Sequence, residues 1–372
     1  MIRVLVVDDS GFMRIALRQI IEADGDMQVV GEARTGVEAV QMARDLKPEL
    51  VTMDVEMPEM DGLEATRLIM AEHAVPPRIV MVSNHTQAGA DAAIMALRLG
   101  AVDFLSKSTT FVKTDLGMLD TELRARLRVW GDQRVSRRRE LKDPATSVAD
   151  SPRHAPVSIS EPRIIGSPEM PGVSGRPAMG PIDLIVVAGS TGGPQTLPEI
   201  LSQMGRVGAP MLVAQHMPEL FTRSFAQHMR DDTGLDVREG GHRAELLAGS
   251  VTLIPGGRDG IIARAPGGLE LRLCKGDGAV HPSADMLFQS AAAIARHPLA
   301  VILTGMGSDG TKGAAFFRQR RLTVLAQSPD TCVIGGMPQA AIEAEVVTEV
   351  RAADQIGSRI AELVAASAAR SS

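Results

Sequence analysis

The sequence predicts an α/β protein built from two doubly wound domains that a proline-rich linker joins. Short apolar runs alternate with helical patterns over residues 1–128 and again over residues 182–372, as expected where strands and crossover helices follow one another. Between these stretches, residues 129–181 carry an arginine-rich segment and many prolines without an apolar period, which is typical of an extended tether. A length of 372 residues also suits two domains better than one.

The first domain is expected to hold five strands with helices between them. The predicted strands cover residues 4–7, 28–31, 50–54, 78–82 and 102–105. Because each strand is followed by a helical segment, the most economical arrangement is a parallel, doubly wound sheet.

The second domain repeats this alternation on a larger scale. Strands are predicted at residues 184–187, 211–214, 251–254, 261–264, 269–273, 300–304, 323–327 and 346–348, and helices near 195–204, 218–231, 284–297, 311–319 and 354–366. The short, glycine-separated strands within 251–273 indicate an antiparallel excursion on a mainly parallel, Rossmann-like sheet.

Composition excludes several classes of protein. A formal charge of −6 without a basic domain argues against a nucleic-acid partner. The two cysteines, Cys274 and Cys332, are too few for a disulfide framework. The sequence shows neither a signal peptide nor a membrane span, so we expect a cytoplasmic protein without membrane insertion.

The stretch Ile182 to Pro194 reads as a buried strand, a glycine-rich turn and a helix start, with Ser190 in the turn. Three interpretations are open: a nucleophile, a phosphate-binding loop, or an ordinary tight connection. Ala188 stands where the G-x-S-x-G nucleophile elbow has its first glycine. The Lys-Ser or Lys-Thr of a Walker loop is also missing.

Polar residues follow the predicted strands of the first domain, where open α/β sheets bind their ligands. They are Asp8, Asp9, Asp54, Ser83 and Lys107. Clustered carboxylates repel one another unless a cation lies among them, and magnesium suits such oxygen ligands. The alternative is a set of solvated loop carboxylates.

These segments resemble a response-regulator receiver domain, which is a flavodoxin-like fold. The motifs are VVDDS at 6–10, DVEMPEMDGLE at 54–64, VSN at 82–84 and AVDFLSK at 101–107. The resemblance implies that Asp54 accepts a phosphoryl group and that magnesium is bound there. The implied ligands and contacts are Asp8, Asp9, Asp54 and the Glu56 carbonyl for the metal, Ser83 and Lys107 for the phosphoryl group, and Phe104 as the aromatic that moves with Ser83. Ser108 departs from the proline common after the lysine.

Two further polar residues follow strands of the second domain as Ser190 does: His216 and Asp309. Parallel strand ends can converge on one crevice, and a nucleophile, a base and a carboxylate are what acyl transfer needs. A rival is the G-x-G-x-x-G at 305–310, with Asp330 twenty residues on, which matches a dinucleotide site by spacing. Against it, Asp309 would place a carboxylate in a turn that must hold an anionic pyrophosphate.

The second domain resembles the catalytic domain of chemotaxis protein-glutamate methylesterases, which are also protein-glutamine glutaminases. The matching segments are STGGP at 190–194, QHMPELFTRSFA at 215–226, HPSADMLFQSAA at 281–292, LTGMGSDG at 303–310 and GGMPQAA at 335–341. The resemblance implies Ser190 as nucleophile, His216 as base, Asp309 as the carboxylate that orients it, and the Met306 N–H as an oxyanion donor. Thr191 would neighbour them or cap the following helix.

The resemblance also implies the biological setting. The substrates would be glutamate γ-methyl esters and glutamines of methyl-accepting chemotaxis receptors, and a chemotaxis histidine kinase would be the phosphodonor in two-component signalling. No cofactor is expected for the esterase chemistry.

The sequence departs from the family pattern at two places. Residues 188–190 read Ala-Gly-Ser where Gly-Ala-Ser is common, and Asp259 replaces a common histidine. Cys332 is expected to be an inert, buried thiol. Two other function classes remain as alternatives: an adapter that binds receptor helices without turnover, and a nucleotide-dependent oxidoreductase.

Overall fold

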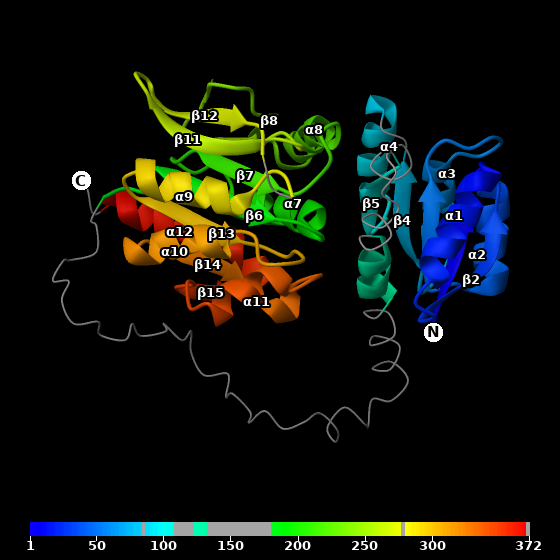
Figure 1. Cartoon of the computed structure of the whole chain (residues 1–372). Coiled ribbons are helices and arrows are strands. Elements are labelled where there is room, and N and C mark those ends of the chain that lie inside the picture. The colour runs from blue at the N-terminus through cyan, green and yellow to red at the C-terminus, as the bar shows by residue number, and fades with distance from the viewer. Residues whose placement is uncertain (84–85, 108–122, 132–179, 277–279, 370–372) are drawn as a thin grey trace, which may run out of the picture. The chain divides into compact units, whose positions relative to one another are not determined.

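The computed structural model describes residues 1–83, 86–107, 123–131, 180–276 and 280–369 (Figure 1). The chain divides into two compact units, Met1–Pro162 and Arg163–Ser372. The predicted linker lies almost entirely outside the described residues, as does Ser108.

The first unit is a five-stranded parallel sheet in the order β2-β1-β3-β4-β5, which confirms the predicted doubly wound fold. Its strands are β1 (Ile2–Val7), β2 (Met27–Ala33), β3 (Leu50–Asp54), β4 (Arg78–Ser83) and β5 (Asp103–Ser106). Its helices are α1 (Gly11–Glu22), α2 (Gly36–Leu46), α3 (Gly62–Glu72), α4 (Gln87–Arg98) and residues 123–131.

Side-chain caps start the helices that follow the first four strands. In each case a side-chain oxygen accepts a hydrogen bond from the backbone N–H three residues later, which satisfies a donor that the helix itself leaves unpaired. The capping residues are Ser10, Thr35, Asp61 and Thr86. These N-cap residues start the helices at the carboxyl edge of the sheet, where the chain leaves each buried strand.

The second unit has a seven-stranded parallel sheet in the order β15-β14-β13-β6-β7-β10-β8 and a separate antiparallel sheet, β11-β12-β9. The strands of the large sheet are β6 (Leu184–Gly189), β7 (Met211–Gln215), β8 (Asp236–Glu239), β10 (Ser250–Leu253), β13 (Pro298–Ile302), β14 (Val324–Gln327) and β15 (Glu349–Arg351). The small sheet holds β9 (Ala244–Glu245), β11 (Asp259–Ala265) and β12 (Gly268–Cys274). The two α/β domains confirm the predicted fold class. The antiparallel part is smaller than predicted, because β10 pairs parallel with β7 and β8 in the large sheet.

Six α-helices of the second unit lie within the described residues. They are α7 (Gly193–Met204), α8 (Phe221–Thr233), α9 (Ala284–Ile294), α10 (Thr311–Gln319), α11 (Gly336–Glu343) and α12 (Ala353–Ala369). A stretch of 3-10 helix, η1, covers Pro329–Thr331. The predictions missed α11, β8 and β9, whose short sequences carry weak apolar periodicity.

The predicted strand at 346–348 is wrong, because the strand is β15, immediately after it. Val346 and Val347 are buried in the core outside any strand, and the Val346 N–H donates to the Ala341 carbonyl at the end of α11. An apolar pair that packs beneath a helix end has the same composition as a short buried strand, so sequence could not separate the two.

The strand order places the centre of the large sheet at β13-β6-β7. The chain moves from β6 to β7 on one side and later returns to β13 on the other side, so the strand order reverses beside β6. In open α/β sheets such a switch point opens a crevice at the carboxyl ends of the strands. β6 ends immediately before Ser190.

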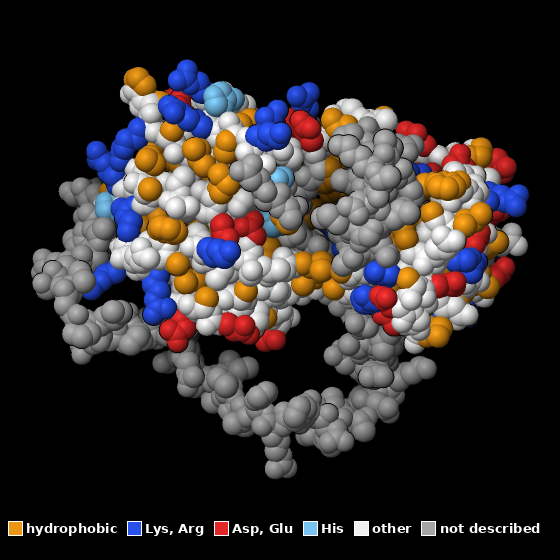
Figure 2. Space-filling view, viewed as in Figure 1, with side chains coloured by type: hydrophobic (Ala, Val, Ile, Leu, Met, Phe, Trp, Pro, Cys, Tyr) orange, Lys and Arg blue, Asp and Glu red, His pale blue; other side chains and the backbone are white. Residues whose placement is uncertain are grey.

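Charged side chains of both signs lie interspersed with apolar ones on the visible face of the second unit (Figure 2). Among the described residues, no helix is long and apolar enough to cross a membrane.

Candidate active site and acidic pocket

Ser190 is held in a tight turn between β6 and α7. Its N–H donates to the Thr304 carbonyl at 3.0 Å, and its own carbonyl accepts the Gly193 N–H at 2.8 Å. Gly192 adopts φ +85°, and a Cβ there would lie 2.6 Å from Val333. The turn therefore needs glycine at 192 both for its backbone angle and for space.

His216 follows β7, the neighbour of β6. Its backbone N–H donates to the Gly189 carbonyl at 2.9 Å, which joins the end of β7 to the last residue of β6, immediately before Ser190. The His216 ring is largely buried, and its Nε2 lies 2.9 Å from Asp309 Oδ2. With Nε2 directed to a carboxylate, Nδ1 is the ring nitrogen left for a reacting group.

Asp309 lies in the loop after β13 and caps the N-terminus of α9. Its carboxylate accepts backbone N–H groups of Ala284 at 2.7 Å and Asp285 at 2.9 Å, besides the His216 contact. Burial opposes its ionisation, but these hydrogen bonds outweigh burial and hold the pKa of Asp309 below its ordinary value. The site thus contains a stable carboxylate against the imidazole.

The role of α9 was missed from sequence. Its N-terminal residues, Ser283 to Asp285, supply the donors that hold Asp309. The signal for this was available, because Ser283 is a side-chain cap for α9 and its position predicts exposed N–H groups there.

The glycine motif at 305–310 does not present a free helix N-terminus for a dinucleotide. Asp285 Oδ1 accepts the Gly310 N–H at 2.9 Å and the Gly313 N–H at 2.8 Å at the start of α10. A pyrophosphate would have to displace this half-buried carboxylate, so the geometry disfavours the dinucleotide interpretation. Asp330 lies in η1.

Asp259 is buried, and its carboxylate contacts the segment that leads into α9. Its Oδ1 accepts the Ser283 N–H at 2.7 Å and lies 2.9 Å from His281 Nδ1. The residue that departs from the family pattern therefore supports the segment before α9. Thr191 is buried too, but the N-cap of α7 is Gly192, and no side chain caps that helix.

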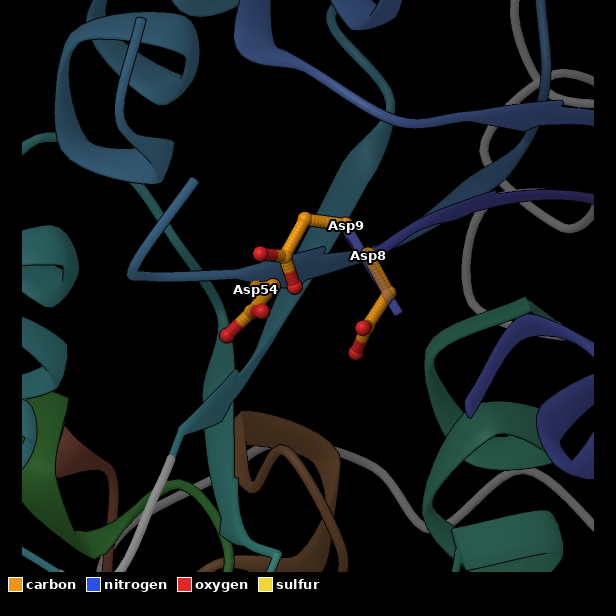
Figure 3. Close-up of side chains that lie close together, drawn as sticks. All are labelled: Asp8, Asp9 and Asp54. Carbon is orange, nitrogen blue, oxygen red and sulfur yellow. The ribbon is translucent and has the colours of Figure 1, made fainter. Parts of the chain in front are cut away.

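Three carboxylates gather at the carboxyl ends of β1 and β3 in the first unit (Figure 3). Ligand oxygens from Asp8, Asp9 and Asp54 lie within 4.8 Å of one another. Lys107 Nζ lies 2.9 Å from Asp8 Oδ2 and 2.6 Å from Asp54 Oδ2. Burial raises the pKa of Asp54 to about 6, against the opposing effect of the Lys107 ammonium.

The donor set fits magnesium. Asp54 Oδ1 is buried and has no hydrogen-bond partner among the described residues, so it is an acceptor that a bound cation would satisfy. Hard carboxylate oxygens at this spacing are what Mg²⁺ prefers. Of the other predicted residues, Ser83 ends β4, Phe104 is buried in β5 and Glu56 follows β3 by two positions.

Comparison with known proteins identifies both units. Residues 185–360 match the family described as CheB methylesterase, and residues 4–114 match the response regulator receiver domain. A protein-glutamate methylesterase/protein-glutamine glutaminase of Thermotoga maritima is 38% identical over 98% of this chain and 98% of its own. The chain belongs to the CheB methylesterase family.

A second relative gives the same result. That relative, from Saccharophagus degradans, is 36% identical over 96% of this chain and 98% of its own. The crystal structure of the Thermotoga maritima CheB methylesterase catalytic domain is 36% identical, covers 49% of this chain and 99% of that chain, and has a TM-score of 0.48. Membership confirms the resemblance of both domains: this CheB-type chain is a protein-glutamate methylesterase/protein-glutamine glutaminase with a receiver domain.

Proposed function

We propose that this chain removes methyl groups from glutamate γ-methyl esters of chemoreceptors, and deamidates receptor glutamines, through Ser190, His216 and Asp309. The observation that carries the proposal is the 2.9 Å contact between His216 Nε2 and Asp309 Oδ2 at the strand end beside Ser190. A nucleophile, an imidazole and an orienting carboxylate at one sheet edge are the groups that acyl transfer requires.

The chemistry follows from the orientation of the imidazole. Asp309 accepts the Nε2–H and so selects the tautomer in which Nδ1 can take a proton. Ser190 Oγ attacks the γ-carbonyl as its proton passes to His216 Nδ1. His216 then gives this proton to the departing methoxide, which leaves as methanol, or to the side-chain amide nitrogen of glutamine, which leaves as ammonia. Water attacks the acyl-enzyme by the same route in reverse, which releases glutamate and restores Ser190.

Two backbone N–H groups are suited to stabilise the oxyanion. The Ser190 carbonyl is engaged by Gly193 on its inner side, and in a trans peptide the next N–H, that of Thr191, points the opposite way. Gly305 packs against Ser190, since a Cβ at 305 would lie 2.6 Å from the Ser190 Cβ, and Met306 comes next in the chain. The N–H groups of Thr191 and Met306 are therefore our candidates for the donors.

The receiver unit is proposed to regulate this activity. Asp54 would accept a phosphoryl group from a chemotaxis histidine kinase, and Lys107, which contacts Asp8 and Asp54, would pair with that group. Magnesium, when bound by Asp8, Asp9, Asp54 and the Glu56 carbonyl, supplies charge neutralisation for the transfer. Ser83 would contact the phosphoryl group. We propose that the unphosphorylated receiver occludes the active site and that phosphorylation relieves this.

Methanol release from methylated receptor membranes tests the esterase assignment. Ser190→Ala, His216→Ala and the double variant should all lose on the order of 10³-fold or more in turnover and should resemble one another, because members of a catalytic unit are not additive. Asp309→Asn should fold yet lose activity, since an amide can donate to Nε2 and so favour the wrong tautomer. Near-parental turnover by His216→Ala would contradict the assignment.

Binding without turnover is the outcome that the adapter hypothesis predicts. In that case the parent chain would retain receptor membranes and release no methanol above the Ser190→Ala background. A matched control is Ser202→Ala, which removes an exposed hydroxyl from α7 that bonds only within the helix. Its turnover should equal that of the parent.

A further inference from the structure

We propose that Gln215 is a positioning residue that fixes the nucleophile turn against the strand end that carries His216. This inference rests on the proposed function of Ser190 and His216. It concerns a side chain that none of the proposed chemical steps uses.

Gln215 is the last residue of β7, and the residue is 2% exposed. Its Nε2 donates to the Ser190 carbonyl at 2.8 Å and to the His216 carbonyl at 3.2 Å. A single primary amide thus joins the backbone of the nucleophile to the backbone of the base. Because the amide is buried, exchange of these bonds for bonds to water is prevented.

The glycines of the turn make room for this amide. A Cβ at residue 193 would lie 2.0 Å from Gln215 Oε1, and a Cβ at residue 189 would lie 2.7 Å from it. Neither glycine has a positive φ, so the need for glycine at these two positions comes from lack of space and not from the backbone conformation. Two of the glycines that suggested a phosphate-binding loop are therefore accounted for by the Gln215 side chain.

The chemistry of the contact requires an amide. Both partners are carbonyl oxygens, so the side chain must donate twice from one atom, which an NH₂ group can do. A carboxylate of the same shape would set negative charge against two carbonyl oxygens. A thioether of similar length would leave both oxygens without this donor.

The position of the Ser190 carbonyl matters for catalysis in two ways. It sets where the Ser190 side chain leaves the backbone, and it sets the direction of the Thr191 N–H through the shared peptide plane. Displacement of a reacting group by about 1 Å can cost on the order of 100-fold in rate. Loss of the Gln215 amide should therefore lower the rate of the chemical step more than substrate binding.

The test compares Gln215→Met with Ser367→Ala in the full chain. Ser367 is a matched control because its buried hydroxyl also makes two backbone contacts, accepting from the Ile182 N–H and donating to the Val364 carbonyl. It lies near the opposite end of β6, away from Ser190. Methanol release yields kcat and KM, labelling by a phosphonofluoridate reports the reactivity of Ser190, and circular dichroism reports folding.

We expect Gln215→Met to lower kcat on the order of 100-fold, with KM changed less than about threefold, and to slow labelling of Ser190 by a similar factor. Ser367→Ala should keep both rates within about threefold of the parent even if it is less stable. A folded Gln215→Met protein with parental kcat and labelling would overturn the inference.

If Gln215→Met does not fold, Gln215→Asn replaces it. Its amide is one methylene shorter and cannot reach both carbonyls from the same backbone position, so kcat should again fall while KM is kept. Parental kcat in Gln215→Asn would overturn the inference as well. Ser190→Ala is measured in parallel: turnover in that variant would refute the proposed function itself, whereas turnover in Gln215→Met alone would refute only the positioning role.

Discussion

Asp285 and Asp309 cap each other's helices. The Asp309 carboxylate accepts the Ala284 and Asp285 N–H groups at the start of α9. In return, Asp285 Oδ1 accepts the Gly310 and Gly313 N–H groups at the start of α10. The loop that holds the carboxylate against His216 is thus fixed from both ends, and Phe288 and Phe317 pack behind it with ring centroids 5.9 Å apart.

This reciprocity predicts different effects for two substitutions of Asp285. Both of its bonds reach one oxygen, so Asp285→Asn can keep them, whereas Asp285→Ala leaves two N–H groups without this acceptor. Burial and the charge of Asp309 raise the pKa of Asp285, so loss of its charge should cost little.

We expect Asp285→Ala to lower the free energy of unfolding by about 1–3 kcal/mol and to lower kcat roughly tenfold or more. Asp285→Asn should stay near the parent in both. Denaturant titration and methanol release measure the two quantities. Equal losses in the two variants would mean that the charge, and not the hydrogen bonds, holds the loop.

The raised pKa of Asp54 predicts a pH-dependent stability of the receiver. The folded-state value is about 6 against an ordinary 3.8, so the folded state binds this proton more tightly than the unfolded chain does. Below pH 4 Asp54 is protonated in both states, so it does not change the free energy of unfolding. As pH rises from about 4 to about 6, ionisation of Asp54 favours the unfolded chain and progressively lowers the free energy of unfolding.

The Asp54→Asn variant should not lose stability over this pH range, because an amide does not ionise. Its free energy of unfolding should exceed that of the parent by an amount that grows between pH 4 and 6 and levels off near about 1–3 kcal/mol above pH 7. Trp130 is the only tryptophan of the chain, and its Nε1 donates to Asp103 Oδ2, so fluorescence during denaturant titration follows this unit in the intact protein. Asp45→Asn, an exposed position of α2, is the control. An Asp54→Asn advantage independent of pH would contradict the assignment.

Phosphorylation should need both magnesium and Asp54. A small phosphodonor is expected to label the parent with Mg²⁺, to label it poorly in chelator, and to leave Asp54→Ala unlabelled, because the donor's charge cannot otherwise approach the carboxylates. Labelling at full yield in chelator would be inconsistent with the proposed site.

If the unphosphorylated receiver blocks the active site, the rates of ester hydrolysis should differ among three forms of the protein. A shortened chain beginning at Met179 should hydrolyse receptor methyl esters faster than the unphosphorylated full chain, and full-length Asp54→Ala should remain slow with phosphodonor present. If the shortened chain is no faster than the unphosphorylated whole, the receiver activates by recruitment or allostery and does not block the site.

The thiol of Cys332 should be inert, although Cys332 is half-buried and the next residue, Val333, packs against Gly192 in the turn that holds Ser190. Burial, with a smaller effect of the Asp330 charge, raises the pKa of Cys332 to about 12, so almost none of it is thiolate at pH 8. Iodoacetamide at pH 8 should leave turnover unchanged, and Cys332→Ala should match the parent. Inactivation in proportion to Cys332 alkylation would contradict this.

The sequence by itself determined the strands, the turns after them and the chemical identity of the groups at their ends. Branched apolar runs predict buried strands wherever they are long enough, as at β6 and β3, and polar residues directly after such runs must lie at the carboxyl edge. This reasoning is enough to propose Ser190, His216, Asp309 and Asp54 as candidates, because each lies in a short segment at or after the end of such a run.

Only the tertiary structure decided how these groups face one another. The choice of Nε2 for Asp309, the mutual capping of α9 and α10, and the use of Gln215 as a donor all depend on which strands are neighbours. A buried glutamine after an apolar run has the same local sequence whether it joins two strand ends or merely fills a core. Its partners lie across the sheet, and a hydrogen bond between residues far apart in the chain leaves no periodic signal in either segment.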